Sequence, residues 1–282
     1  VSALCADKGW NCTDPAVHGM FGMWHFNSDQ ATCGYGCSGN PYDAWWAFEP
    51  LGWGDAHEVG HGQQRPRMQI DNVTGEVSNN IFPIHTVYSY NATHPTAPVH
   101  AGHEPTQAAQ FTMLSDAAKT ADPKAAVHDA LWVKGTYDRL EFYVQLAWQA
   151  QSLPQFGDGG WDLYTGLYLQ DRLFGKAVAS DAAWAAAKDG LGFGSYDRTT
   201  AAAISGNDWM LVATSYLTGK DQRPFFDLWG VNYSDKASAQ VAAFGYPAAE
   251  KRFYLAYSDA TGPWYGHDPL GSVVVDGTTT LP

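Results

Sequence analysis

Apolar residues recur three or four positions apart through most of the chain beyond residue 105, a spacing that places them on one face of a helix. The clearest face lies within residues 137–151 and consists of Leu140, Tyr143, Val144, Ala147 and Trp148. Five segments with this spacing are predicted helices: 107–120, 137–151, 161–173, 181–188 and 207–218. Because Gly and Pro separate them, we expect roughly two-thirds of the chain to be a helical array.

The front of the chain has a different pattern. Residues 1–50 are rich in Gly, Cys, Trp and Pro and show little periodicity, which predicts loops with short strands such as residues 22–26. A helix is predicted next, over residues 55–64, with Asp55 capping its first turn and Pro66 following its end.

A second helix is predicted to begin near Glu76 and to stop by Pro83, because proline interrupts a helix interior. A Tyr-rich extended piece and a loop over residues 90–105 are expected to follow. Near the C-terminus, the run 273–275 is the one β-prone stretch in an otherwise irregular tail.

Charge and composition narrow the possible partners. The 282 residues carry 16 Lys and Arg against 29 Asp and Glu, a net charge of −13, which argues against nucleic acid and against a basic membrane anchor. No apolar stretch approaches the roughly 18 to 20 residues that span a bilayer, so membrane insertion is not expected. The 12 Trp, 15 Tyr and 13 Phe indicate a large core, a carbohydrate-facing cleft, or both.

All four cysteines, Cys5, Cys12, Cys33 and Cys37, lie in the first 37 residues. An even number in one loop-like segment predicts two disulfides and an oxidising, extracellular location, with three pairings possible. The rival interpretation is a zinc knot, but the spacings lack the tight Cys-x2-Cys of most structural zinc sites.

The pattern His57-Glu58-Val59-Gly60-His61 carries the most specific chemistry, and it falls on the first predicted helix. Residues four apart share one helix face, so both imidazoles can bind one zinc ion. Zinc lowers the pKa of a bound water, and the adjacent Glu58 is placed to take its proton as it attacks a peptide carbonyl. The alternative is that these are ordinary surface residues in a His-rich region.

A catalytic zinc site needs a third protein ligand and an open position. A metzincin would continue with Gly at position 64 and His at 67, and Gln64 and Arg67 exclude that class. Asp71 and Glu76 compete for the role. Glu76 is favoured because it is expected on a rigid following helix, and Asn80, one turn later, is expected to orient a ligand histidine.

These residues resemble a known family. The run from Gly52 to His61, followed by Gly75-Glu76-Val77-Ser78-Asn79-Asn80-Ile81-Phe82, is similar to the enhancin-like, mucin-targeting zinc metallopeptidases, whose His-Glu-x-x-His precedes a Glu-Val-x-Asn-Asn segment. Asp208-Trp209 and the run from Asp221 to Gly230 resemble a later helical motif of that family. The resemblance covers about residues 40–247.

The resemblance implies a mainly α (α+β) fold, with a gluzincin-like zinc peptidase catalytic domain, a helical C-terminal subdomain and a small disulfide-tied β/loop N-terminal part. We expect residues 1–104 to hold that N-terminal part and the zinc helices, and residues 105–282 to form the helical subdomain. The resemblance also implies that His57, His61 and Glu76 bind zinc and that Glu58 acts as the base. Family members cleave glycoproteins and mucins, several beside O-glycosylated Ser or Thr. The resemblance further implies a β-rich subdomain before the active helix, as in gluzincin-type domains, and only 56 residues precede His57, so further domains of a longer parent chain are expected.

Aromatic residues just before the zinc helix, Trp46 and Trp53 above all, are candidates to stack on a sugar ring, although core packing explains them equally well. A second metal on His100, His103 and Glu104 is less favoured because Pro and Gly surround them. Two further functions stay open on the residues alone: a noncatalytic carbohydrate-binding module, and a zinc hydrolase with a nonpeptide substrate.

Overall fold

The computed structural model describes residues 2–13, 53–94, 107–255 and 268–281. Within these ranges the fold is almost entirely helical, and a single two-stranded antiparallel sheet pairs β1 (Arg252–Leu255) with β2 (Gly271–Val274). In the described part of the chain, no helix has the length and apolar character needed to cross a membrane. The mainly α class is therefore confirmed.

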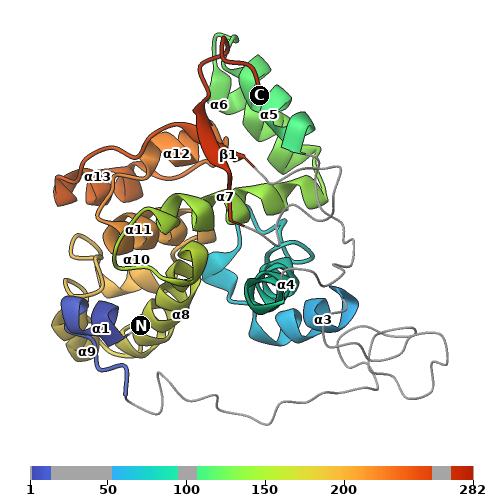
Figure 1. Ribbon diagram of the computed structural model, residues 1–282. Coiled ribbons are helices and arrows are strands. Elements are labelled where there is room, and N and C mark those ends of the chain that lie inside the picture. Colours follow the sequence, from blue (N-terminus) through green and yellow to red (C-terminus); the bar gives the residue numbers. More distant parts are fainter. Residues whose placement is uncertain (1, 14–52, 95–106, 256–267, 282) are drawn as a thin grey trace.

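The helix that carries the His-Glu-x-x-His pattern is α3 (Trp53–Gln63), close to its predicted bounds. The chain then turns through two short 3-10 helices, η1 (Pro66–Met68) and η2 (Ser78–Asn80), into α4 (Ile81–Thr93). Figure 1 shows α3 and α4 side by side, on the opposite side of the molecule from α1 and α9.

The prediction for residues 75–90 was wrong in two respects. Glu76 lies in a turn before η2, not at a helix start, and the Tyr-rich piece is helical. Pro83 does not stop the helix because it is the third residue of α4, where backbone N–H groups have no intrahelical acceptor to lose.

The helical array predicted beyond residue 105 is present, with additional short helices between its members. The elements are α5 (Gln107–Ala117), α6 (Pro123–Val127), the π-helix η3 (His128–Val133), the 3-10 helix η4 (Tyr137–Arg139), α7 (Leu140–Gln151), the 3-10 helix η5 (Asp158–Gly160), α8 (Asp162–Ala177), α9 (Asp181–Ala187), α10 (Arg198–Ala202), α11 (Gly206–Thr218), α12 (Arg223–Leu228) and α13 (Asp235–Phe244). Periodicity missed α13, although Ser234 caps its first turn and Gly245 ends it in the left-handed conformation.

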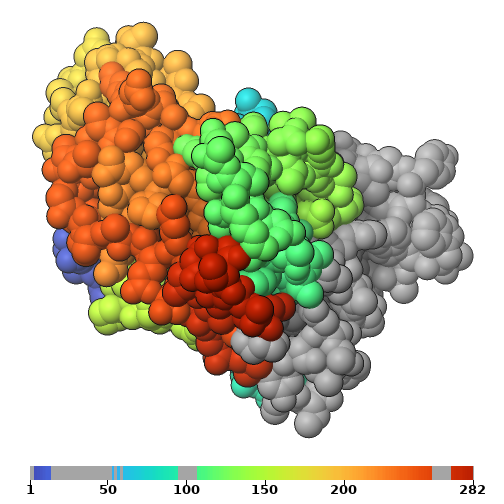
Figure 2. Space-filling view, turned by 90° about the horizontal axis from the view of Figure 1, so that it is seen from above, coloured from blue at the N-terminus to red at the C-terminus, as the bar shows by residue number. Residues whose placement is uncertain are grey.

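Helix α7 forms the centre of the core. Its predicted apolar face is buried, and so is the opposite face, including Phe142 and Leu146. Two buried polar residues on it bind internal partners: Glu141 Oε1 accepts from Gln145 Nε2 (2.7 Å), and Gln145 also bonds both the N–H and the C=O of Tyr254 in β1. Figure 2 shows the C-terminal segment lying against the α5–α7 region.

The N-terminal part differs from the predicted loops and strands. Ser2–Lys8 form a helix, α1, and a disulfide joins its Cys5 to Cys12. Trp10 Nε1 donates to Gly190 O (2.9 Å), which fixes this segment to the α9 side of the molecule. Cys33, Cys37 and the predicted strand at residues 22–26 lie outside the described ranges, so their arrangement stays a prediction.

The packing of α3 on η2 depends on Gly60. A Cβ atom at this position would lie 2.5 Å from Asn79 O and 3.0 Å from Phe82 Cδ2, closer than side-chain carbons approach such atoms. Gly60 is buried, and only hydrogen fits between the two backbones.

We therefore expect Gly60→Ala to lower the free energy of unfolding by roughly 1 to 3 kcal/mol, because α3 must move away from η2. Chemical denaturation measures this. Gly62→Ala is the matched control: a Cβ there meets nothing within 4 Å, so the same change should be neutral or stabilising. Equal stability of the two variants would refute the close-packing argument.

Candidate metal centre

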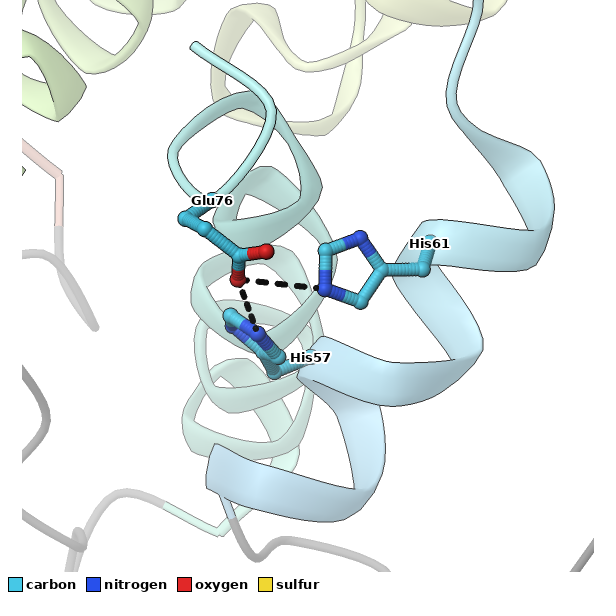
Figure 3. Close-up of side chains that lie close together, drawn as sticks. All are labelled: His57, His61 and Glu76. Atoms are coloured by element: carbon cyan, nitrogen blue, oxygen red, sulfur yellow. Dashed lines mark ion pairs between the residues drawn. The ribbon is translucent and has the colours of Figure 1, made fainter. Parts of the chain in front are cut away.

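His57 and His61 share the face of α3 that looks toward η2 (Figure 3). Their ring centroids are 4.7 Å apart and the rings are nearly perpendicular, as expected for residues one helical turn apart. The side chains of His57 and His61 are 15% and 18% exposed, so both are largely buried but remain accessible to solvent.

Glu76 reaches the histidines from the turn before η2. Its Oε2 lies 3.3 Å from His57 Nε2 and 3.3 Å from His61 Nε2. One ligand atom from each of the three residues lies within 4.8 Å of the other two, and Figure 3 shows the carboxylate directed at both rings. The Glu76 side chain is 69% exposed, which leaves this side of the cluster open to water.

The far nitrogen of each imidazole is held by a side-chain amide oxygen. His57 Nδ1 donates to Asn80 Oδ1 (2.6 Å), and His61 Nδ1 donates to Gln64 Oε1 (2.9 Å). Both amide orientations are fixed, because Asn80 Nδ2 donates to Glu76 O (2.9 Å) and Gln64 Nε2 donates to Gly75 O (2.6 Å) and to Ser78 Oγ (2.8 Å).

These contacts determine the tautomers. A proton on each Nδ1 leaves Nε2 as an electron-pair acceptor, and Asn79 Nδ2, 3.1 Å from His61 Nε2, is consistent with that state. Two imidazole lone pairs and a carboxylate oxygen therefore converge. Two imidazole nitrogens and a carboxylate oxygen are the donor types that hold zinc, so the set fits a divalent metal of that kind.

The competing residue Asp71 points elsewhere. It and Asn72 have positive φ angles of 51° and 56°, and this turn directs Asp71 toward α11. Asp71 Oδ1 accepts from Asn207 Nδ2 (2.6 Å), and its backbone N–H donates to Asn207 Oδ1 (2.7 Å). Among the described residues, Glu76 and not Asp71 is brought to the two histidines.

Asn80 was predicted to orient a ligand histidine, and its bond to His57 matches that role. The contacts of Gln64 and Asn79 with His61 were not predicted. Gln64 was detectable in principle, since it lies three residues after His61 and so shares its face. Asn79 lies in the Glu-Val-x-Asn-Asn segment, but its spacing gave no indication that it contacts the histidines. It is fully buried and donates to His57 O (3.2 Å), an interaction that exists only because η2 folds back on α3.

Several predicted residues lie outside what the structure describes: Trp46, His100, His103, Glu104 and the side chain of Glu58, whose backbone is in α3. Trp53 is described. It starts α3 and packs, partly buried, against the main hydrophobic core, so its predicted contact with sugar stays a prediction.

The sequence and the fold match known proteins. The family model of peptidase M60, enhancin and enhancin-like, matches residues 29–230. The immunomodulating metalloprotease of Pseudomonas aeruginosa is 38% identical over 266 residues, which are 89% of this chain and 28% of that protein. The chain thus spans less than a third of that relative.

Solved structures of the metallopeptidase IMPa from Pseudomonas aeruginosa have the same fold. One superimposes with a TM-score of 0.74 at 33% identity, over 90% of this chain and 29% of the other. Another, a complex with an O-glycopeptide, superimposes with a TM-score of 0.75 at 31% identity, over 95% of this chain and 32% of the other. The family model covers more than half of the sequence, and the chain therefore belongs to the peptidase M60, enhancin and enhancin-like family.

Proposed function

We propose that this chain is a secreted zinc endopeptidase that cleaves glycoproteins of the mucin type beside O-glycosylated Ser or Thr. The observation that carries the proposal is the convergence of two imidazole Nε2 atoms and the Glu76 carboxylate, with each Nδ1 fixed by an amide oxygen. In this proposal His57, His61 and Glu76 hold the zinc, and the solvent-exposed side of Glu76 leaves room for water and substrate.

When bound, zinc acts as a Lewis acid that polarises a carbonyl and makes water more acidic. The protein's part is proton transfer and positioning. Glu58, next to His57 on α3, accepts the proton of the attacking water and donates it to the leaving nitrogen. Asn80 and Gln64 keep the rings in one orientation and one tautomer, so that each Nε2 lone pair would be directed at the metal.

The substrate class rests on the relatives. IMPa has been solved with T-antigen and with an O-glycopeptide, and these structures share the fold of this chain. Trp46 and Trp53 are proposed to contact the glycan. Secretion is supported by the Cys5–Cys12 disulfide, a bond that persists in oxidising compartments.

For the domain organisation, we propose that residues 1–104 and 105–282 are two parts of one catalytic domain within a longer parent protein. One hydrophobic cluster supports this, because it contains buried residues from both parts, among them Met68 and Ile84 from the first and Tyr143 and Trp209 from the second. The coverage of only 28% of the Pseudomonas relative agrees with further domains.

Replacing the proposed base separates chemistry from metal binding. Glu58→Gln should retain about one zinc per chain and lose nearly all peptidase activity, on the order of a thousandfold or more, because the amide cannot accept the proton. Elemental analysis and peptide cleavage measure the two properties. Full turnover in this variant would eliminate the mechanism, and wild-type protein purified with far less than one zinc would favour a binding module instead.

The third ligand is tested by two carboxylate variants. Glu76→Ala should lose most of the zinc with little change in stability, because its side chain is exposed. Asp71→Ala should keep the zinc but lower the free energy of unfolding by about 1 to 3 kcal/mol, since it removes the bond to Asn207 and places Ala at positive φ. Loss of zinc in Asp71→Ala alone would reverse the assignment.

Substrate class is tested by digestion of a mucin and of the same mucin after enzymatic deglycosylation. Mass spectrometry of the products should show cleavage next to glycosylated Ser or Thr in the first sample and little cleavage in the second. Equal cleavage of both would reject glycan dependence, and no cleavage of either by zinc-loaded protein would favour a nonpeptide substrate.

A further inference from the structure

Gln64 connects the two separate segments that form the candidate metal centre. It directly follows α3, and its side-chain oxygen accepts from His61 Nδ1 (2.9 Å). Its side-chain nitrogen donates to Gly75 O (2.6 Å) and to Ser78 Oγ (2.8 Å). One amide therefore joins a histidine on α3 to the turn from which Glu76 reaches both rings (Figure 3).

The backbone on both sides of the Glu76 side chain is held by an amide that also holds a histidine. Gln64 bonds the carbonyl of Gly75, and Asn80 Nδ2 donates to the next carbonyl, that of Glu76 (2.9 Å). Asn80 also bonds His57 Nδ1. These two side chains and their bonds form what we call the amide brace. It consists of protein groups alone, so it fixes the three donor residues relative to one another without help from an ion.

The Gln64 part of the amide brace is anchored in the core. Ser78 is 6% exposed and Thr74 is completely buried. Ser78 Oγ donates to Thr74 O (3.0 Å), and the Thr74 hydroxyl lies 3.1 Å from the hydroxyl of Tyr143 on α7. Water competes little with hydrogen bonds in such a buried environment. The connection from His61 to the central helix therefore resists displacement.

The spacing of the donor atoms suits a small ion. Glu76 Oε2 lies 3.3 Å from Nε2 of His57 and 3.3 Å from Nε2 of His61. Zinc binds such atoms at about 2.0 to 2.1 Å in a tetrahedral arrangement, which places two ligand atoms about 3.3 Å apart. A larger divalent ion such as cadmium forms longer bonds and moves the donor atoms apart. That expansion stretches the amide brace.

We propose that Gln64, together with Asn80, makes this centre selective for zinc over larger divalent ions such as cadmium. Gln64 acts as a positioning residue: by tying His61 to the turn of Glu76, it opposes the expansion that a larger ion requires. The inference rests on the proposed function, because it takes zinc as the resident ion. It adds to that function the residue that decides which metal is held.

The test is competition of the metal-free chain with a chromophoric chelator, which measures the dissociation constants for Zn²⁺ and Cd²⁺ separately. Gln64→Met keeps the length of the side chain and removes its hydrogen bonds, so zinc should bind about 10-fold to 100-fold more weakly. Cadmium should lose less than about threefold, because it no longer has to stretch the brace. The ratio of the two constants therefore shifts toward cadmium. An equal loss for both ions, or no loss for zinc, would overturn the proposal.

Gln63→Met is the matched control. Gln63 is the preceding residue, and it lines a pocket between α4 and α8 instead of bonding His61. Both dissociation constants should equal those of the wild type. The same shift of the ratio in this variant would show that any change at the end of α3 alters selectivity, which contradicts a specific role of Gln64.

Gln64→Glu separates the orientation of the imidazole from the bracing. Its carboxylate can still accept from His61 Nδ1, but it has no proton to donate to Gly75 O or Ser78 Oγ. This variant should bind zinc more tightly than Gln64→Met and still show the shifted ratio. A wild-type ratio would mean that imidazole orientation alone sets selectivity, against the proposal.

Ser78→Ala provides a milder variant, because it removes one of the two acceptors of Gln64 and leaves the bond to Gly75. The ratio should shift toward cadmium by a smaller factor than in Gln64→Met. Chemical denaturation of each metal-free variant measures stability in parallel. Lower stability with a wild-type ratio in both variants would assign these residues a merely structural role and refute the proposal.

The metal titrations also distinguish this inference from the proposed function. If the wild type takes up no zinc, both are wrong. If the wild type binds zinc and the ratio does not change in Gln64→Met, only the inference is wrong. If the ratio shifts as expected while mucin is not cleaved, the selectivity of the centre stands and the proposed substrate class is wrong.

Discussion

The candidate metal centre depends on the close approach of α3 to the 3-10 helix η2. At Gly60 the two backbones come nearer than any side chain permits, with only hydrogen between Gly60 and Asn79 O. This contact brings the amides of Asn79 and Asn80 within reach of the histidines on α3 and aims the Glu76 carboxylate at both rings. Without it Glu76 would lie apart from the two histidines, which α3 by itself places on one face.

The segment between α3 and η2 is held in turn by the central helix. Tyr143 on α7 donates to Met68 O (3.0 Å) and lies 3.1 Å from Thr74 Oγ1, so one buried hydroxyl contacts both ends of the connecting loop. Burial raises the pKa of Tyr143 well above its ordinary value, so the phenol stays protonated as a donor. The rigidity that a metal site requires thus comes from the core, although the candidate ligands themselves are near the surface.

Sequence by itself determined the helical character, a helix over residues 55–64 that the structure places at 53–63, and the presence of His57 and His61 on one face, because helical periodicity and residue spacing are local properties. It also indicated Asn80 as a partner of a histidine. It misplaced Glu76 on a helix and ended α4 at Pro83, because neither the turn nor the first-turn position of that proline is visible in periodicity. The sequence favoured Glu76 over Asp71 on the ground of a helix that is absent, and only the tertiary structure shows Glu76 reaching the histidines from a turn while Asp71 bonds Asn207. The contacts of Arg65 and Arg67 with Asp171 were likewise decided only by tertiary structure. These contacts depend on which buried partner a side chain meets across the fold, and the partners are far apart in sequence: Asn207 lies 136 residues after Asp71, and Asp171 lies 104 residues after Arg67.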